Sequence, residues 1–160
     1  MATGPDGTVY VSDMATSKIH RIKDGKASTF AEGDRLEHPN GLLVEGESLV
    51  VAAWGKPEAD FSTKVPGHLY RLNIATGAKT LITTKPTGNL DGLESDGKGG
   101  YIVSDWMAGK IYQISSNGET RMVRQFKQGA ADLAYLPASR TLIVPHMLEN
   151  RVQAYDLSGD

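Results

Sequence analysis

The chain has 160 residues, which is enough for one domain with a hydrophobic core and leaves little room for a second. A formal net charge of -2, with the 17 basic residues scattered along the chain, gives no reason to expect nucleic acid or an anionic membrane as a partner. The absence of cysteine excludes disulfides, thiolate metal sites and cysteine nucleophiles.

The first seven residues, Met1 to Gly7, contain neither the basic nor the apolar stretch of a signal peptide. No segment approaches the roughly 18 consecutive apolar residues that a membrane span needs. The sequence therefore predicts a soluble domain, and it leaves open whether the compartment is the cytoplasm or the periplasm.

Four segments of the chain repeat one pattern of β-branched and aromatic residues. They are Thr8–Asp13, Ser48–Trp54, Gly100–Trp106 and Thr141–His146. Aligning Val11, Val51, Val103 and Val144 gives steps of 40, 52 and 41 residues. A repeat at such a step indicates one supersecondary unit used several times.

Further strands are expected on both sides of each repeated segment. Alternating apolar and polar residues follow at Lys18–Ile22, His68–Leu72, Lys110–Ile114 and Arg151–Tyr155. Inner strands are expected before three of the segments, at Gly41–Glu45, Gly92–Ser95 and Asp132–Leu136, and outer strands near Ser28–Ala31, Lys79–Thr83 and Arg121–Phe126. Four antiparallel strands in about 40 residues are typical of a β-propeller blade.

The sequence thus predicts an all-β protein, a partial β-propeller of about four blades that span approximately residues 1–33, 38–85, 89–127 and 129–160. A β-sandwich is the alternative, but it has no reason to repeat Ser-Asp-aromatic at a fixed step. The first blade has only Met1 to Gly4 for its inner strand, and the fourth ends without an outer strand. Missing blades of a longer protein, or a homo-oligomer of this chain, would then close the ring.

Strand parity predicts which face of the propeller carries chemistry. The starts of the inner strands, the ends of the second strands and the loops that follow them share one face, and the Asp-Gly and Asn-Gly hairpin turns lie on the other. The insertion Gly55–Gly67 follows a second strand and is expected on the first face, as a lid or as a tolerated surface loop.

Three polar residues are expected to point from successive inner strands toward the central channel. They are Asn40, Asp91 and Asp132, and oxygen ligands in a ring suit a hard divalent cation, Ca²⁺ first, with Mg²⁺ or Zn²⁺ as alternatives. Asn-Gly and Asp-Gly also form turns, so the alternative is a purely local role.

Other residues on the same face are candidates for contact with a substrate. Asp91, Asp105 and His146 are candidate catalytic groups, since a carboxylate or an imidazole can act as general base. His38, Trp54, Trp106 and Met147 are candidate substrate contacts, the last three as apolar walls. The alternatives are hydrogen bonds of Asp105 to the next loop, a rim position for each histidine, and packing of tryptophan between blades.

Several of these segments resemble the senescence-marker-protein/gluconolactonase family. They are His38-Pro39-Asn40-Gly41-Leu42, Asp91-Gly92-Leu93 with Asp96-Gly97, and Tyr101-Ile102-Val103-Ser104-Asp105. The resemblance implies a six-bladed propeller that holds a divalent cation in its channel and hydrolyses lactones or related esters. It also implies that Asn40 and Asp91 are metal ligands, whereas the family's acidic ligand from an early blade has no counterpart in these residues.

Two hypotheses of different classes follow. The first is a metal-dependent hydrolase whose substrate is a small lactone or ester. The second is a non-catalytic propeller that binds a small ligand or a protein on this face, or a partial propeller without activity.

Overall fold

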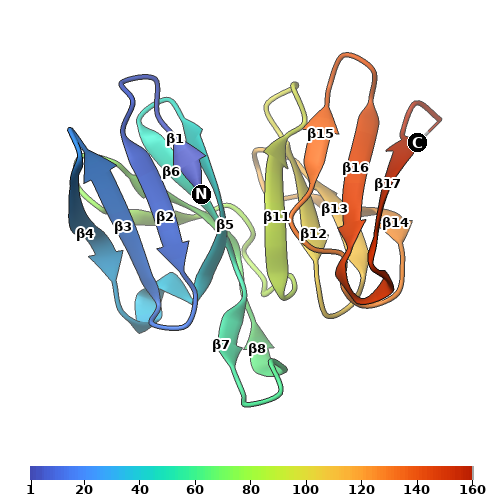
Figure 1. Ribbon diagram of the computed structural model, residues 1–160, viewed down its shortest axis with the longest axis horizontal. Coiled ribbons are helices and arrows are strands. Elements are labelled where there is room, and N and C mark those ends of the chain that lie inside the picture. Colours follow the sequence, from blue (N-terminus) through green and yellow to red (C-terminus); the bar gives the residue numbers. More distant parts are fainter. Residues whose placement is uncertain (160) are drawn as a thin grey trace.

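The computed structural model describes residues 1–159, and in this part of the chain nearly all regular structure is β-strand (Figure 1). The strands form four antiparallel sheets side by side and one separate hairpin. The only helices among these residues are the short 3-10 segments η1 (Asp34–Leu36) and η2 (Met147–Glu149), and neither is long enough to cross a membrane.

The first two sheets are four-stranded blades. The first blade contains, from inner to outer strand, β1 (Ala2–Thr3), β2 (Val9–Asp13), β3 (Lys18–Lys23) and β4 (Lys26–Glu32). The second contains β5 (Pro39–Glu45), β6 (Ser48–Ala53), β9 (Leu69–Asn73) and β10 (Lys79–Leu81). Between β6 and β9 the chain makes the hairpin β7 (Gly55–Pro57) and β8 (Thr63–Pro66).

The third sheet is again four-stranded, and the fourth has three strands among the described residues. The third blade contains β11 (Leu90–Ser95), β12 (Tyr101–Asp105), β13 (Lys110–Ile114) and β14 (Thr120–Gln125). The fourth contains β15 (Ala134–Leu136), β16 (Thr141–His146) and β17 (Arg151–Asp156). The innermost strands β1, β5, β11 and β15 lie next to one another in this order, as they do around the axis of a propeller.

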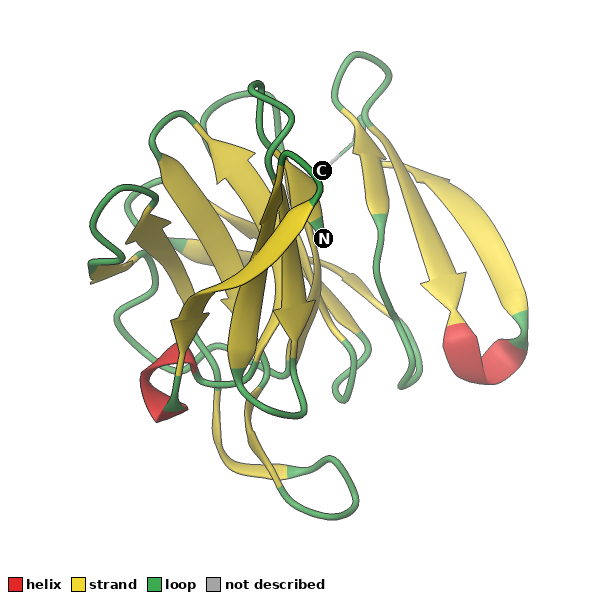
Figure 2. Cartoon of the chain, turned by 60° about the vertical axis from the view of Figure 1, so that its left-hand side comes forward, coloured by secondary structure: helices red, strands yellow, loops and turns green. Residues whose placement is uncertain are grey.

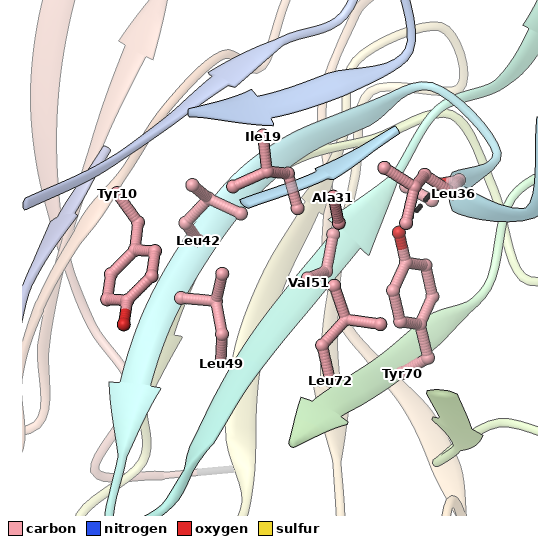
Figure 3. Packing of buried hydrophobic residues seen from close by; sticks show 10 residues of the cluster. Tyr10, Ile19, Ala31, Leu36, Leu42, Leu49, Val51, Tyr70 and Leu72 are labelled. Carbon is pink, nitrogen blue, oxygen red and sulfur yellow. Dashed lines mark hydrogen bonds between the residues drawn. The ribbon is translucent and has the colours of Figure 1, made fainter. Parts of the chain in front are cut away.

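Apolar side chains fill the spaces between successive blades. In β6, Leu49 and Val51 point into the core shared with the first blade, whereas Val50 and Ala52 point into the core shared with the third. Because both faces of this strand are buried, its sequence is an unbroken apolar run. Figure 3 shows the first of these cores, where the Tyr70 hydroxyl also donates a hydrogen bond of 2.6 Å to the carbonyl oxygen of Leu36.

The end blades bury only one face. In β16, Leu142 and Val144 are buried against the third blade, while Ile143 and Pro145 on the opposite side are partly exposed. On that same side Val152 of β17 is 68% exposed. The predicted all-β propeller with an unclosed ring is therefore confirmed, and the end blades present the faces on which further blades would pack.

The insertion after the second strand of blade 2 forms the hairpin β7–β8, which projects beyond the blades (Figures 1 and 2). In Figure 1 it leaves the lower end of the molecule, where the β2–β3 turn and η1 also lie. The hairpin therefore stands at the face where the second strands end, between the blades rather than at their outer rim.

Candidate functional site

A cavity of about 310 Å³ lies at the inner strands of the first three blades and at the segment that leads into the fourth. It is lined from β5 by Asn40, from β11 by Asp91 and Glu94, and from the connection before β15 by Asp132. Three carboxylates and one carboxamide thus face one cavity, and no lysine, arginine or histidine side chain within residues 1–159 lines it. Carboxylates that share a cavity without basic side chains favour the binding of a cation or a proton.

A bulge in each of the inner strands β5 and β11 explains why Asn-Gly and Asp-Gly occur at equivalent places. In β5 the pairing with β6 shifts between Pro39 and Leu42, and in β11 the pairing with β12 shifts between Leu90 and Leu93. Each shift leaves two residues, Asn40-Gly41 or Asp91-Gly92, opposite one residue of the neighbouring strand. A bulge of this kind re-aims side chains, and it does so here at the cavity.

The two glycines allow adjacent inner strands to touch. A Cβ atom on Gly41 would lie 2.3 Å from the carbonyl oxygen of Asp91, and one on Gly92 would lie 2.6 Å from the backbone nitrogen of Leu133. Neither distance is compatible with a side chain. In each dipeptide the glycine therefore allows the backbones to approach closely at the channel, and the residue before it supplies the polar side chain.

Asp91 is the carboxylate with the most unusual environment. Burial, and next to it the negative charge of Asp132, raise the pKa of Asp91 to about 6. The same two causes raise the pKa of Glu94. Within residues 1–159 neither carboxylate has a hydrogen bond or an ion pair that would offset its burial.

The side-chain oxygen Oδ1 of Asn40 is available to coordinate a cation. Its amide nitrogen faces the sulfur of Met14 at 4.0 Å, and no described residue donates to Oδ1. The donor set of Asn40, Asp91 and Asp132 thus fits a hard divalent cation in chemistry. In the described part of the chain, however, no three acidic or histidine side chains converge closely enough to hold a metal ion by themselves. A cation would need the Asn40 amide and further oxygen ligands.

Asp105 lies outside the cavity, although it aligns with the end of a second strand as expected. Its carboxylate accepts a hydrogen bond of 3.0 Å from the backbone N–H of Ala108 and packs against Gly88, where a Cβ atom would lie 2.3 Å from Oδ2. Burial raises the pKa of Asp105, and backbone N–H groups oppose that rise. Asp13 makes the equivalent hydrogen bond to Thr16 in the first blade. This geometry corresponds to the alternative in which Asp105 forms hydrogen bonds to the loop that follows its strand.

His146 also lies away from the cavity, in the space between the third and fourth blades. Its side chain is 3% exposed, its Nε2 is 2.8 Å from the Tyr155 hydroxyl, and Phe126 packs against it edge to face. Burial first, and then the charge of Arg151, lower the pKa of His146. The structure thus does not bring His146 together with Asp91.

The predicted aromatic contacts form one cluster with the projecting hairpin. The ring centroids of Trp54 and Trp106 are 5.8 Å apart, and Phe61 at the hairpin tip packs edge to face on Trp54 at 6.4 Å. The indole N–H of Trp54 donates to the carbonyl oxygen of Phe61 at 2.9 Å. Asn89 donates to the Trp54 carbonyl oxygen and to the Thr63 hydroxyl, so it ties the hairpin, from its root at Trp54 to the first residue of β8, to the segment just before β11.

This aromatic cluster stands beside the mouth of the channel. The backbone N–H of Trp54 bonds the carbonyl oxygen of His38, and that of Trp106 bonds the carbonyl oxygen of Asn89. Asn40 and Asp91 follow these two acceptors by two residues, a distance of at most about 7 Å along an extended chain. Trp54 is nearly buried, Trp106 is half-buried and Phe61 is 52% exposed, so the surface available to a ligand is that of Phe61 and Trp106.

The remaining predicted contacts, His38 and Met147, are on separate parts of this face. His38 has φ of 55° and its Nδ1 is 2.7 Å from the carbonyl oxygen of Met14, which fixes the ring against the first blade. Met147 begins η2 in the fourth blade and is 61% exposed. Neither lines the channel cavity.

Beside His38, Glu37 ties the segment that leads into the second blade to the outer part of that blade, through charged contacts that the sequence pattern did not reveal. Its carboxylate accepts from the His68 backbone and ring at 3.0 and 2.8 Å and from Lys79 at 2.5 Å. The Lys79 ammonium also lies 4.1 Å from the centre of the Tyr70 ring. Burial by itself raises the pKa of Glu37, but the hydrogen bonds from Lys79 and His68 outweigh it and lower the pKa below its usual value.

Sequence reasoning also missed Glu94, Ser104 and Phe61. The sequence pattern places Glu94 within an ordinary strand, because the bulge that turns β11 at Asp91 is not visible in an alternating pattern. Ser104 was visible only as part of the repeated Val-Ser-Asp pattern. Phe61 lies in an insertion that has no repeat to align it, so its packing on Trp54 could not be inferred.

No protein-family model and no curated protein matches this sequence. Solved structures do match in three dimensions. A streptogramin B lyase superposes with a TM-score of 0.71 at 13% identity, covering 99% of this chain and 54% of that one. A gluconolactonase from Xanthomonas campestris superposes with a TM-score of 0.66 at 17% identity, covering 89% of this chain and 52% of that one.

A chain of a nidogen/laminin complex also superposes, with a TM-score of 0.66 at 13% identity, covering 92% of this chain and 60% of that one. These likenesses define the class of protein as a β-propeller. The chain spans little more than half the length of the solved structures it matches. At identities this low, the structural likeness establishes the fold, and the activity has to be argued from the site.

Proposed function

We propose that this chain is part of a metal-dependent hydrolase of a lactone or a related ester, with the cation held in the central channel. The observation that carries the proposal is the cavity in which Asn40, Asp91 and Asp132 meet without any basic side chain. The likeness to a gluconolactonase supports the choice of substrate class, at the level of a shared fold.

In this proposal Asn40, Asp91 and Asp132 hold the cation through oxygen atoms, which favours Ca²⁺ and admits Mg²⁺ or, less well matched, Zn²⁺. When bound, such a cation polarises an ester carbonyl group and makes a coordinated water more acidic. With no cation bound, the pKa of Asp91 is raised to about 6, which suits this carboxylate to accept a proton near neutral pH, and the pKa of Glu94 is also raised. The Phe61 and Trp106 surface would contact the apolar part of the substrate.

A complete channel needs more blades than this chain contributes to the structure. The partly exposed apolar residues Ile143, Pro145 and Val152 on the side of the fourth blade are suited to packing against another blade. We therefore assign the activity to the closed ring, whose other blades come from a longer protein or from a second copy of this chain. Sedimentation equilibrium of the chain decides between them, because a monomeric mass would exclude the homo-oligomer.

Hydrolysis of glucono-δ-lactone, followed by titration of the released acid, tests the proposal. We expect the closed ring, as the oligomer of this chain or as the longer protein, to be active with added Ca²⁺ and to lose that activity in excess chelator. Asn40→Ala and Asp91→Asn should each lower kcat/KM by about 100-fold or more, since the first removes an oxygen ligand and the second replaces a charged carboxylate ligand with a neutral carboxamide. The matched control is Asp13→Asn, which changes an aspartate outside the cavity and should retain activity. Activity that is indifferent to the chelator and to both cavity substitutions would contradict a metal-dependent hydrolase.

A second candidate, a binding propeller without catalysis, has one observation in its favour. Large apolar side chains are exposed at the hairpin and at η2, namely Phe61, Val65, Met147 and Leu148. Exposed apolar residues of this size are typical of a contact surface for a protein or ligand. A closed ring that binds Ca²⁺ but hydrolyses no lactone in the same assay would favour this candidate.

A further inference from the structure

The hydroxyl group of Ser104 lies fully buried between the inner strands of two blades. It accepts a hydrogen bond of 2.7 Å from the backbone N–H of Gly92 and donates one of 2.9 Å to the carbonyl oxygen of Ala131. Gly92 belongs to the same blade as Ser104, whereas Ala131 lies in the segment that leads into the fourth blade. One side chain therefore ties the third blade to the fourth at the channel.

Both hydrogen-bonded groups belong to peptide units that flank a cavity carboxylate. The N–H of Gly92 is part of the peptide that follows Asp91, and the carbonyl of Ala131 is part of the peptide that precedes Asp132. Because a peptide unit is planar, a hydrogen bond to one of its atoms orients the whole unit. The Ser104 hydroxyl thus orients the backbone next to the Cα atoms of Asp91 and Asp132.

The position of Ser104 follows from the bulge in β11. Leu90 pairs with Asp105 and Leu93 pairs with Val103, so Asp91 and Gly92 together stand opposite Ser104. The bulge removes Gly92 from the regular ladder, and the serine hydroxyl supplies an acceptor that its N–H would otherwise lack. In blade 2 the residue opposite the equivalent bulge is Ala52, which has no such group.

A similar interaction holds the third cavity residue. The Ser12 hydroxyl in β2 donates a hydrogen bond of 2.6 Å to the carbonyl oxygen of Asn40 in the next blade. Ser12 and Ser104 occupy the same place in the repeated Val-Ser-Asp segment. The serine of this segment thus joins the second strand of one blade to the inner strand of the next in both cases.

We propose that Ser104 is a positioning residue that sets the placement of Asp91 relative to Asp132 and so fits this pair of carboxylates to one divalent cation. The inference rests on the proposed function, since it assigns the cavity to a cation. The two strands are in close contact here, since a Cβ on Gly92 would lie 2.9 Å from the Cα of Asp132. A shift of either peptide unit therefore moves both Asp91 and Asp132.

Calcium titration by calorimetry, with Tb³⁺ luminescence as a second measure of the same site, tests the proposal on the wild-type chain, Ser104→Ala and Val103→Ala. Val103 is fully buried next to Ser104 but points into the apolar core, so its truncation destabilises the same strand without touching the hydrogen bonds. We expect Ser104→Ala to weaken Ca²⁺ binding by about tenfold or more and Val103→Ala to leave it within about twofold.

Equal loss of affinity in both variants, or no loss in Ser104→Ala, would overturn the positioning role while leaving the cation site in place. Absence of Ca²⁺ binding by the wild-type chain would overturn the proposed function and this inference together. Amide hydrogen exchange of the wild-type chain keeps the test independent of how Ser104→Ala folds. Slow exchange of the Gly92 N–H supports the buried hydrogen bond, and exchange at the rate of a solvent-exposed amide overturns it.

Discussion

Asp91 and Asp132 come from neighbouring blades of the propeller and bring two carboxylates to one cavity without a basic side chain between them. Burial and the charge of Asp132 together raise the pKa of Asp91 to about 6. A carboxylate in this environment destabilises the fold once it is ionised, unless a cation neutralises it. This cost is the physical reason to regard the cavity as a functional site rather than as part of the scaffold.

The first prediction concerns the stability of the fold in the absence of divalent cations. The pKa of Asp91 is higher in the folded chain than its ordinary value of 3.8, so the folded state binds more protons between about pH 4 and pH 6. The contribution of Asp91 to the free energy of unfolding should therefore fall as the pH rises through this range, by up to about 3 kcal/mol. Asp91→Asn should remove the effect and be the more stable chain at pH 7.5, but not at pH 4.

Urea unfolding in excess chelator at the two pH values measures this difference. Asp13→Asn is the control with the opposite sign, because hydrogen bonds from Thr16 lower the pKa of Asp13 and make its ionised form the stabilising one. A wild-type chain whose free energy of unfolding changes between pH 4 and pH 7.5 by the same amount as that of Asp91→Asn would show that Asp91 is not held in a costly ionised state.

The second prediction concerns Glu37, which contacts both His68 and Lys79. Its folded-state pKa is lowered, so its contribution to stability is present above its ordinary pKa of 4.5 and is lost as the pH falls below it. Glu37→Gln removes the charge and at least one of these hydrogen bonds, at a cost of about 1–3 kcal/mol at pH 7. Chemical denaturation at pH 7 and at pH 3 should show a cost that is much smaller at the lower pH, and an equal cost at both would contradict the assignment.

The third prediction concerns the hydroxyl of Tyr101, which joins blades 2 and 3. It donates to the Glu45 carboxylate at 2.8 Å and accepts from the Arg71 guanidinium at 2.6 Å. Tyr101→Phe should cost about 1–2 kcal/mol, because the ring stays buried while two charged groups lose a partner. Tyr112→Phe is the matched control, since the Tyr112 hydroxyl bonds no described residue. Equal thermal melting temperatures for the two variants would contradict a role of the hydroxyl.

The sequence repeat predicted most of the fold. Val11, Val51, Val103 and Val144 align because each occupies the second strand of a blade, and the apolar run of β6 reflects a strand buried on both faces. The glycines after Asn40 and Asp91 were also informative, since only glycine permits the strand contact at the channel. Residues that depend on equivalent positions in a repeated unit were therefore accessible to sequence reasoning.

Residues that depend on packing across blades were not accessible in this way. His146 differs from Asp105 at the aligned position, which suggested a special role, yet its ring packs against Phe126 and Tyr155 and faces away from the channel. Glu94 lies in the cavity because a bulge shifts the alternation of β11. A sequence pattern reports which face of an ideal strand a residue occupies, and it cannot report local departures from that strand.

The last prediction concerns Phe61, whose backbone has φ of 64° at the tip of the β7–β8 hairpin. This left-handed conformation costs a residue with a side chain about 1 kcal/mol or more, so the contacts of the ring with Trp54 and the bond from the Trp54 indole must offset it. Phe61→Ala keeps the backbone cost and loses the ring. Phe61→Gly loses the ring and relieves the backbone.

We therefore expect Phe61→Ala to loosen the hairpin and shift tryptophan emission to longer wavelength. Phe61→Gly should shift it less, because glycine keeps the turn without strain. If the hairpin contacts substrate, both variants should raise KM for lactones with a long alkyl substituent by about tenfold, with little change for unsubstituted lactones or in kcat. Emission that moves in neither variant would mean that Phe61 does not pack on Trp54 in solution. A KM that rises equally for all lactones would assign Phe61 to the scaffold of the site and not to its selectivity.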